Sequence, residues 1–175
     1  MIVLLMGVSG TGKTTVGRAL AQTTGWQFAD ADDYHSEANR AKMRAGIPLT
    51  DEDRESWLQS LHEQLAAWTR ENGNGILACS ALRASYRITL TAGLRQDAIR
   101  LVYLTGPPEV IRQRLEQRHG HYMPPSLLPS QLAILEPPRD AIEISIMQPV
   151  SAMVEEILRS IGGAAYAEEN GTKSS

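Results

Sequence analysis

The chain alternates between short apolar runs and longer segments in which apolar residues recur at helical spacing. Continuous apolar runs of this length are typical of strands that are buried on both faces of a parallel sheet. The pattern predicts such strands at 2–6, 26–30, 76–80, 99–104 and 142–146. Because helical segments separate these runs, we expect an α/β fold with a parallel sheet of about five strands flanked by helices.

The helical segments have recognisable ends. The clearest helix begins at Thr50, carries three acids at 51–53, and has an apolar stripe that ends at Trp68. Acidic residues in a first turn are favoured by the helix dipole. Two further helices are predicted, one from 107 to about 120, begun by two prolines, and one at 150–161.

Length and composition limit the class of protein. At 175 residues, with 42% hydrophobic and 21% charged residues, the chain fits one globular domain, predicted at 1–162. The small, polar segment 163–175 is predicted to be a flexible tail. A formal net charge of −3 argues against a nucleic-acid partner, which normally requires a basic surface.

Cellular location is predicted from two further features. No run approaches the roughly 20 apolar residues of a membrane span, so no membrane partner is expected. The single cysteine, Cys79, cannot form an internal disulfide, and we interpret it as buried strand packing. We therefore predict a cytoplasmic protein.

A phosphate-binding loop follows the first predicted strand. Residues 7–14 read GVSGTGKT, which matches the pattern G-x-x-x-x-G-K-[ST]. Lys13 is expected to reach the β- and γ-phosphates of ATP, and the hydroxyl of Thr14 is expected to ligate Mg²⁺. A glycine-rich turn without a ligand is the alternative, but a strand before it and a helix ending near Gly25 favour phosphate binding. The predicted ATP contacts in the loop are Gly7, Val8, Ser9, Gly10, Thr11, Gly12, Lys13, Thr14 and Thr15.

Acidic residues follow the second predicted strand, in the segment FADADDYH. Asp30 and Asp32 are two positions apart, so their side chains would point the same way in an extended chain. With Thr14 they form the predicted metal site, and Asp32 is also the predicted acceptor of a hydroxyl proton. Alternatively, Asp32 or Asp33 caps a helix that starts near Tyr34, and both roles are compatible.

Two residues near these acids are candidates for contact with the phosphate acceptor. His35 lies one helical turn beyond Asp32, and this position beside the acids favours substrate contact, although a lone histidine is more often structural or solvated. Arg54 is either a solvated helix charge or the cation that recognises an anionic acceptor, because arginine binds carboxylates in a bidentate manner. Spacing alone leaves both alternatives open.

A segment at about 119–130 is predicted to form a lid. Arg114 and Arg118 are four residues apart and share one helix face, and they lead into the glycine- and proline-containing run HGHYMPPSLLPSQ. The functional interpretation is that the lid closes and places Arg118, and with it Arg114, against the phosphates of ATP. The alternative is a pair of solvated arginines.

The order of the motifs resembles the gluconate kinase (gluconokinase) family over about residues 1–160. The Met43–Trp57 segment, CSAL and GHYMP carry the most specific part of this resemblance. The full set of matching segments is MGVSGTGKTT, DADDYH, NRAKMRAGIPLTDEDRESWL, CSALRASYR, YLTGPPEVIRQRL, RHGHYMPPSLLPSQLAILEPP and QPV.

The resemblance implies a P-loop kinase fold with three layers and a small lid. It implies transfer of a phosphoryl group from ATP, with Mg²⁺, to the 6-hydroxyl of D-gluconate in a cytoplasmic homodimer. Gluconate carries a carboxylate and hydroxyls, so Asp32 and His35 suit its hydroxyls, while Arg54, Arg83 and Arg87 are candidate cations.

The chain departs from the family pattern at two places. Arg83 stands where the family commonly has lysine, and Pro124-Pro125 makes the lid richer in proline. The alternatives are a shikimate kinase, a nucleoside monophosphate kinase, or, in a different class, a non-catalytic ATP-binding module.

Overall fold

A single parallel sheet forms the centre of the computed structural model, which describes residues 1–117 and 125–171, with side chains described up to 162. The strand order is β2-β3-β1-β4-β5, and every neighbouring pair is parallel. The strands are β1 (Ile2–Met6), β2 (Gln27–Asp30), β3 (Gly75–Ala78), β4 (Ile99–Thr105) and β5 (Ile142–Ser145). The α-helices are α1 (Lys13–Thr24), α2 (Glu37–Arg44), α3 (Asp51–Arg70), α4 (Ala84–Thr91), α5 (Pro108–Glu116), α6 (Leu128–Ile134) and α7 (Val150–Gly171).

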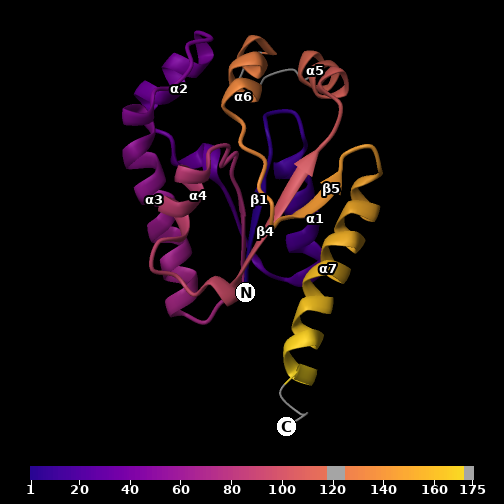
Figure 1. The fold of residues 1–175 in the computed structure, drawn as a ribbon. Helices are drawn as coiled ribbons and strands as arrows, with labels where there is room; N and C mark the ends of the chain where they lie inside the picture. The colour runs from indigo at the N-terminus through magenta and orange to yellow at the C-terminus, as the bar shows by residue number, and fades with distance from the viewer. Residues whose placement is uncertain (118–124, 172–175) are drawn as a thin grey trace.

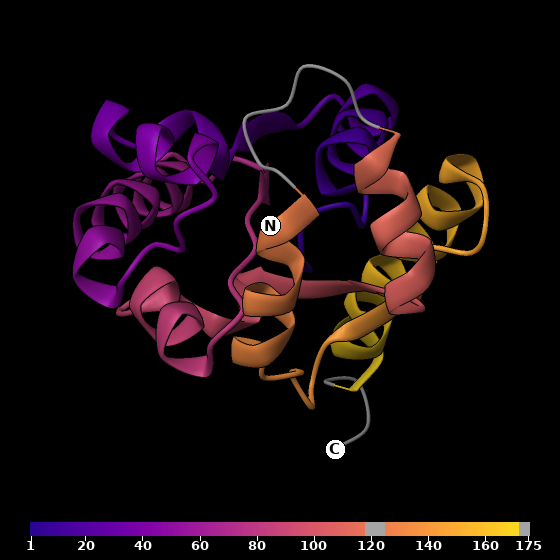
Figure 2. The same ribbon diagram turned by 90° about the horizontal axis from the view of Figure 1, so that it is seen from above.

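Helices cover both faces of the sheet, which gives three layers (Figures 1 and 2). Along β1, Val3 and Leu5 pack with α1, α5 and α7, whereas Ile2 and Leu4 pack with α3 and α4. All four of these side chains are buried. Alternate residues of a strand point to opposite faces, so a fully apolar β1 is what a doubly covered central strand requires.

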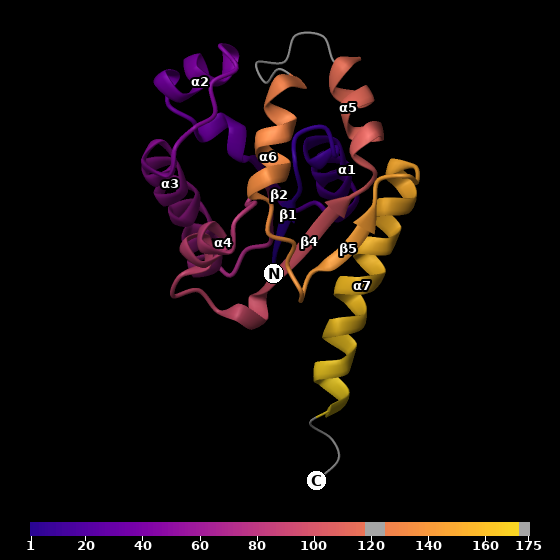
Figure 3. The ribbon, with the colours of Figure 1, turned by 45° about the horizontal axis from the view of Figure 1, so that its top comes forward.

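The loops that follow the strands lie at one end of the sheet, because all strands are parallel. All strands run toward the end of the molecule where α5 and α6 lie, as Figure 3 shows. Strand β1 lies between β3 and β4, so the chain leaves it at the point where the strand order reverses. Crevices at the carboxyl ends of parallel strands, at such a reversal, are where α/β folds bind ligands.

The predicted strands and fold class are confirmed, with each strand within two residues of its expected bounds. The prediction that the helix from 107 reaches about 120 is wrong within the described part, because α5 ends at Glu116. The last helix was expected to end at 161 but continues to Gly171. The flexibility of 163–175 and the domain bounds stay predictions.

The start of α3 is fixed by reciprocal hydrogen bonds. The Thr50 hydroxyl accepts from the Asp53 backbone N–H, and the Asp53 carboxylate accepts from the Thr50 N–H. Asp53 also forms an ion pair with Lys42 of α2 at 2.6 Å, and the side-chain amide of the buried Asn39 donates to the Asp53 carbonyl. These contacts lock α2 to the first turn of α3.

No helix in the described part of the chain has both the length and the apolar character to cross a membrane.

Candidate active site

The loop between β1 and α1 has the backbone of a phosphate-binding loop. Gly7 has φ +146°, and a Cβ there would lie 2.7 Å from the Leu104 carbonyl oxygen. Gly10 has φ +89°, and its Cβ would lie 2.8 Å from Leu115 of α5. Because other residues rarely adopt these angles and would clash here, the glycines are required for the loop to fit between β4 and α5.

Side chains within the loop hold its shape. The buried Thr11 donates its hydroxyl to the Val8 carbonyl at 2.9 Å. The Lys13 ammonium donates to the carbonyls of Gly7 and Val8, at 2.9 and 3.2 Å. Lys13 therefore folds back over the loop, where its positive charge adds to the positive end of α1.

Thr14 and Asp30 meet, as the sequence predicted for a metal site. The Thr14 hydroxyl donates to Asp30 Oδ2 at 2.6 Å, and the other carboxylate oxygen accepts from the backbone N–H of Asp32 at 3.1 Å. A hydroxyl and a carboxylate suit Mg²⁺, which takes few protein ligands and completes its shell with water and phosphate oxygens. The described residues contain no cluster of three or more His, Cys, Asp or Glu side chains that would hold a metal by themselves.

The prediction that Asp30 and Asp32 lie in an extended chain, with their side chains pointing the same way, is wrong. Strand β2 ends at Asp30, and Asp32 lies in a 3₁₀ turn at Ala31–Tyr34, so the chain between them is not extended. The alternative that Asp32 or Asp33 caps a helix is also wrong. Asp30 caps the 3₁₀ turn, and Ser36 caps α2.

Two cavities contain predicted site residues. One, which we name the loop cavity, has a volume of about 350 Å³ and is formed by the loop, α5 and the start of α7. Arg114 lines it and donates to the Ile146 carbonyl at 2.8 Å. Its lining residues are Gly10, Thr11, Gly12, Thr15, Val16, Arg114, Gln148, Pro149, Val150 and Met153.

The other, which we name the polar cavity, has a volume of about 300 Å³. Sequence segments far apart in the chain form it: the turn after β2, the start of α3, the loop after β3, and α6. Of the predicted acceptor-binding residues, Asp32, His35, Arg54 and Arg83 line it. Gln131 of α6 also lines it and is tied to the phosphate loop, because its amide oxygen accepts from the Ser9 N–H at 2.7 Å.

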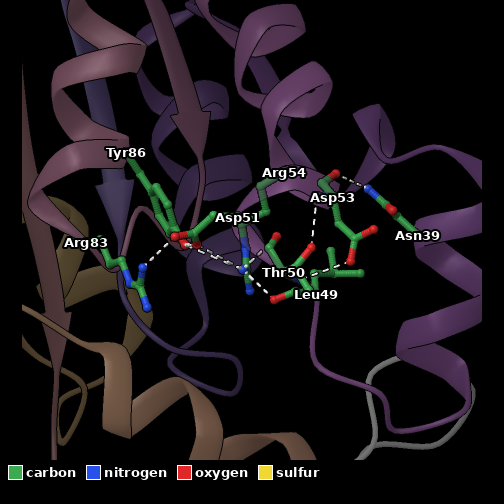
Figure 4. Close-up of polar contacts among 8 residues, drawn as sticks. All are labelled: Asn39, Leu49, Thr50, Asp51, Asp53, Arg54, Arg83 and Tyr86. Atoms are coloured by element: carbon green, nitrogen blue, oxygen red, sulfur yellow. Dashed lines mark hydrogen bonds and ion pairs between the residues drawn. The ribbon is translucent and has the colours of Figure 1, made fainter.

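The two arginines of the polar cavity, Arg54 and Arg83, lie close to the carboxylate of Asp51 (Figure 4). Asp51 accepts from Arg83 at 2.7 Å and from the Tyr86 hydroxyl at 2.5 Å, and Arg54 lies 3.9 Å away. Arg54 also donates to the carbonyl of Leu49 at 2.6 Å. The Tyr86 hydrogen bond, followed by the charge of Arg83, lowers the pKa of Asp51, so this carboxylate is ionised at neutral pH.

His35 stacks on Trp57, with ring centroids 4.5 Å apart and an angle of 7° between the planes. Trp57 is fixed by a 2.7 Å hydrogen bond from its indole N–H to the Ala31 carbonyl. Nδ1 of His35 is buried and has no hydrogen-bond partner among the residues that the structure describes. Burial, with a smaller effect of Arg54, lowers the pKa of His35 to about 4, so the ring is neutral at pH 7.

Arg87 does not contribute to the lining of the polar cavity. Its guanidinium donates to the carbonyls of Ala81, Leu82 and Glu136. These contacts anchor the loop after β3, which itself lines the cavity. The structure thus gives Arg87 a structural role and does not bring it to the predicted acceptor site.

Cys79 is fully buried in the sheet, as predicted, and burial raises the pKa of its thiol to about 12. A thiol with so high a pKa is not a nucleophile at neutral pH.

The predicted lid is described only in part. Arg118 and residues 119–124 lie outside the described residues. Residues 125–130 were expected to form an irregular flap, but they form a 3₁₀ turn at Pro125–Leu127 and the first turn of α6. Proline is well tolerated in a first helical turn, where it replaces an N–H that has no partner within the helix.

The comparisons with known proteins agree with this geometry. The model of the AAA domain family matches residues 2–138. A probable gluconokinase of Mus musculus is 45% identical, over 90% of this chain and 97% of its own. The crystal structure of a sugar kinase from Janibacter sp. HTCC2649 is 46% identical with a TM-score of 0.82, covering 90% of this chain and 91% of its own. A gluconokinase structure from Sinorhizobium meliloti 1021 is 38% identical with a TM-score of 0.80, covering 96% of this chain and 93% of its own.

The parallel sheet and the phosphate loop, together with these similarities, define a P-loop kinase. Identities of this size over nine-tenths of the chain are decisive for the family. The chain belongs to the gluconokinase family.

Proposed function

We propose that the protein transfers the γ-phosphoryl group of ATP to the 6-hydroxyl of D-gluconate, giving 6-phospho-D-gluconate. The observation that carries the proposal is the polar cavity, whose lining combines Arg54 and Arg83 with Asp32 and His35. An acceptor with a carboxylate and several hydroxyls matches that set of groups. The gluconokinases among its relatives favour gluconate over shikimate or a nucleoside monophosphate.

Five polar lining residues have a role in this proposal. Asp32 accepts the proton of the attacking hydroxyl, and neutral His35 forms a hydrogen bond to a second hydroxyl. Arg54 and Arg83 hold the carboxylate. Gln131 joins the polar cavity to the phosphate loop, because its amide oxygen accepts from the Ser9 N–H.

Residues of the phosphate loop act on the other substrate. Lys13 offsets the charge that develops on the transferring group, and Arg114 in the loop cavity supports the nucleotide. Thr14 and Asp30 are the residues that would hold Mg²⁺, which supplies further neutralisation of phosphate charge when bound.

A coupled assay of ADP release tests the function. Gluconate, shikimate and AMP are supplied separately with Mg²⁺ and ATP, and we expect turnover with gluconate alone. Turnover with one of the other acceptors would assign the site to that acceptor. ATP binding without turnover on any of them would support a non-catalytic nucleotide-binding module.

We also propose a cytoplasmic homodimer, which the family resemblance supports. Light scattering coupled to size-exclusion chromatography measures the mass in solution. A monomer of 19.2 kDa at micromolar concentration would contradict the dimer.

A further inference from the structure

The carboxylate of Asp51 contacts the cationic and hydroxyl groups of this cavity that would also contact an anionic acceptor. Its Oδ2 accepts from Arg83 at 2.7 Å, and its Oδ1 accepts from Tyr86 at 2.5 Å and lies 3.9 Å from Arg54 (Figure 4). All four side chains line the polar cavity. A carboxylate entering the cavity therefore competes with Asp51 for the same groups.

The donors are held in place by contacts that do not involve Asp51. Arg54 donates to the carbonyls of Leu49 and Thr50, at 2.6 and 3.2 Å. Both guanidinium groups lie over the Tyr86 ring, with Arg54 at 5.5 Å and Arg83 at 5.8 Å from its centroid. Because these contacts persist without the carboxylate, its departure leaves a formed anion site.

The side chain of Asp51 can move out of the cavity because it is largely exposed. Its side chain is 61% exposed, whereas that of Arg54 is 18% exposed and that of Arg83 is 36% exposed. It is the first residue of α3, so a rotation of its side chain moves the carboxylate into solvent without disturbing the helix. An exposed ion pair of this kind contributes little stability, so an incoming ligand displaces it at small cost.

From these observations we propose that Asp51 holds the place of the acceptor's carboxylate and is displaced when the acceptor binds, which makes it a specificity-determining residue. The proposal rests on the proposed function, since it takes the acceptor to be a carboxylate. A small inorganic anion has to displace Asp51 for contact with the cations alone. Gluconate gains contacts to Asp32 and His35 as well, so Asp51 selects against simple anions.

The opposite role is that Asp51 orients Arg83 and Tyr86 for the substrate. The two roles predict opposite effects of removing the charge. A displaced carboxylate competes with the substrate, so its neutralisation strengthens acceptor binding. A positioning carboxylate helps the substrate, so its neutralisation weakens acceptor binding.

The test compares the wild type with Asp51→Asn, which keeps the size of the side chain and removes its charge. Glu52→Gln is the matched control, because Glu52 is an exposed acid in the same first turn and is not part of the cavity lining. We expect Asp51→Asn to lower the KM for gluconate roughly 2- to 5-fold, the range that an exposed ion pair allows. Glu52→Gln should leave it unchanged.

D-Glucitol, in which a CH₂OH group replaces the carboxylate, serves as a second ligand. Since it brings no charge to compete with Asp51, its inhibition constant should be the same for the wild type and Asp51→Asn. An unchanged or raised KM for gluconate in Asp51→Asn would overturn the proposal, as would an equal gain for D-glucitol.

A measurement without acceptor separates this proposal from the proposed function. Sulfate should raise the melting temperature of Asp51→Asn more than that of the wild type or Glu52→Gln. Equal sulfate effects in all three proteins would overturn the placeholder role. Absence of wild-type turnover with gluconate would instead overturn the proposed function.

Discussion

The Thr14 hydroxyl donates to Asp30 Oδ2 over 2.6 Å and thereby joins the first turn of α1 to the end of β2. The phosphate loop and the acid segment are separated in the sequence, yet this contact places a hydroxyl and a carboxylate side by side. We expect them to act together on Mg²⁺.

Asp30→Asn should therefore raise the Mg²⁺ concentration needed for half-maximal activity by about 10- to 100-fold, as loss of a metal-orienting group does. Titration of activity with Mg²⁺ at saturating ATP measures the change. Asp33→Asn is the control, because Asp33 is exposed in the same 3₁₀ turn. A Mg²⁺ dependence equal to that of the wild type would contradict the assignment.

Asp32→Asn should lower kcat by roughly 10²- to 10⁴-fold, because the attacking hydroxyl loses its proton acceptor. Calorimetric titration with a non-hydrolysable ATP analogue should show nucleotide affinity close to that of the wild type. Asp33→Asn again serves as the control. If Asp32→Asn instead lost nucleotide binding at an unchanged melting temperature, Asp32 would be a metal-holding residue.

Arg54 and Arg87 form a pair for testing acceptor recognition. Arg54 lines the polar cavity and Arg87 does not. Arg54→Ala should raise the KM for gluconate about 10- to 150-fold, since a charge-assisted hydrogen bond contributes about 1.5–3 kcal/mol, while the KM for ATP changes little.

Arg87→Ala should instead lower the melting temperature, because the carbonyls of Ala81, Leu82 and Glu136 lose their donor. Its KM for gluconate should stay near that of the wild type. The assignment of Arg54 fails if Arg54→Ala affects both substrates equally.

His35 makes stability depend on pH in a direction that its lowered pKa fixes. The folded protein holds the ring with a pKa of about 4, against 6.5 in its ordinary state, so the unfolded chain binds more protons between these values. The stability that the neutral ring contributes is therefore present above pH 6.5 and is lost as the pH falls toward 4. The loss from this group is about 2 kcal/mol between pH 7 and pH 5.

Urea unfolding of the wild type and His35→Gln at both pH values isolates that contribution. The variant loses the stack on Trp57 and is less stable throughout, so the comparison is the change with pH within each protein. We expect the wild type to lose more stability on acidification than His35→Gln. Equal losses would show that folding does not lower the pKa of the ring.

The fold and the phosphate loop could be predicted because their signals are local. The five apolar runs and the glycine pattern of the loop lie in short continuous segments, and the structure confirms the strands and the fold class. The metal site was predicted from the loop pattern and from the acids after the second strand, and the structure brings Thr14 and Asp30 together. The path of the chain after β2 was predicted wrongly, because the same acidic residues can lie in an extended segment or in a 3₁₀ turn.

The acceptor site was predicted less completely because its residues depend on long-range packing. Arg54 and Arg87 are both arginines on helices, and only the packing of α3 and α4 determines which one reaches the cavity. Asp51 was interpreted solely as a first-turn acid, although that same position brings it to Arg83. Gln131 lies 122 residues from its partner Ser9, and no local pattern marks such a contact.

In the proposed function, the polar cavity presents the 6-hydroxyl of gluconate to the phosphate loop. Phosphorus NMR of the reaction product, recorded without proton decoupling, tests it most directly. A phosphate ester on the terminal CH₂OH gives a triplet from coupling to the two protons of that carbon, and the account predicts this triplet in the wild-type reaction with gluconate. A doublet, which indicates phosphorylation of a secondary hydroxyl, or inorganic phosphate as the sole product, would contradict it.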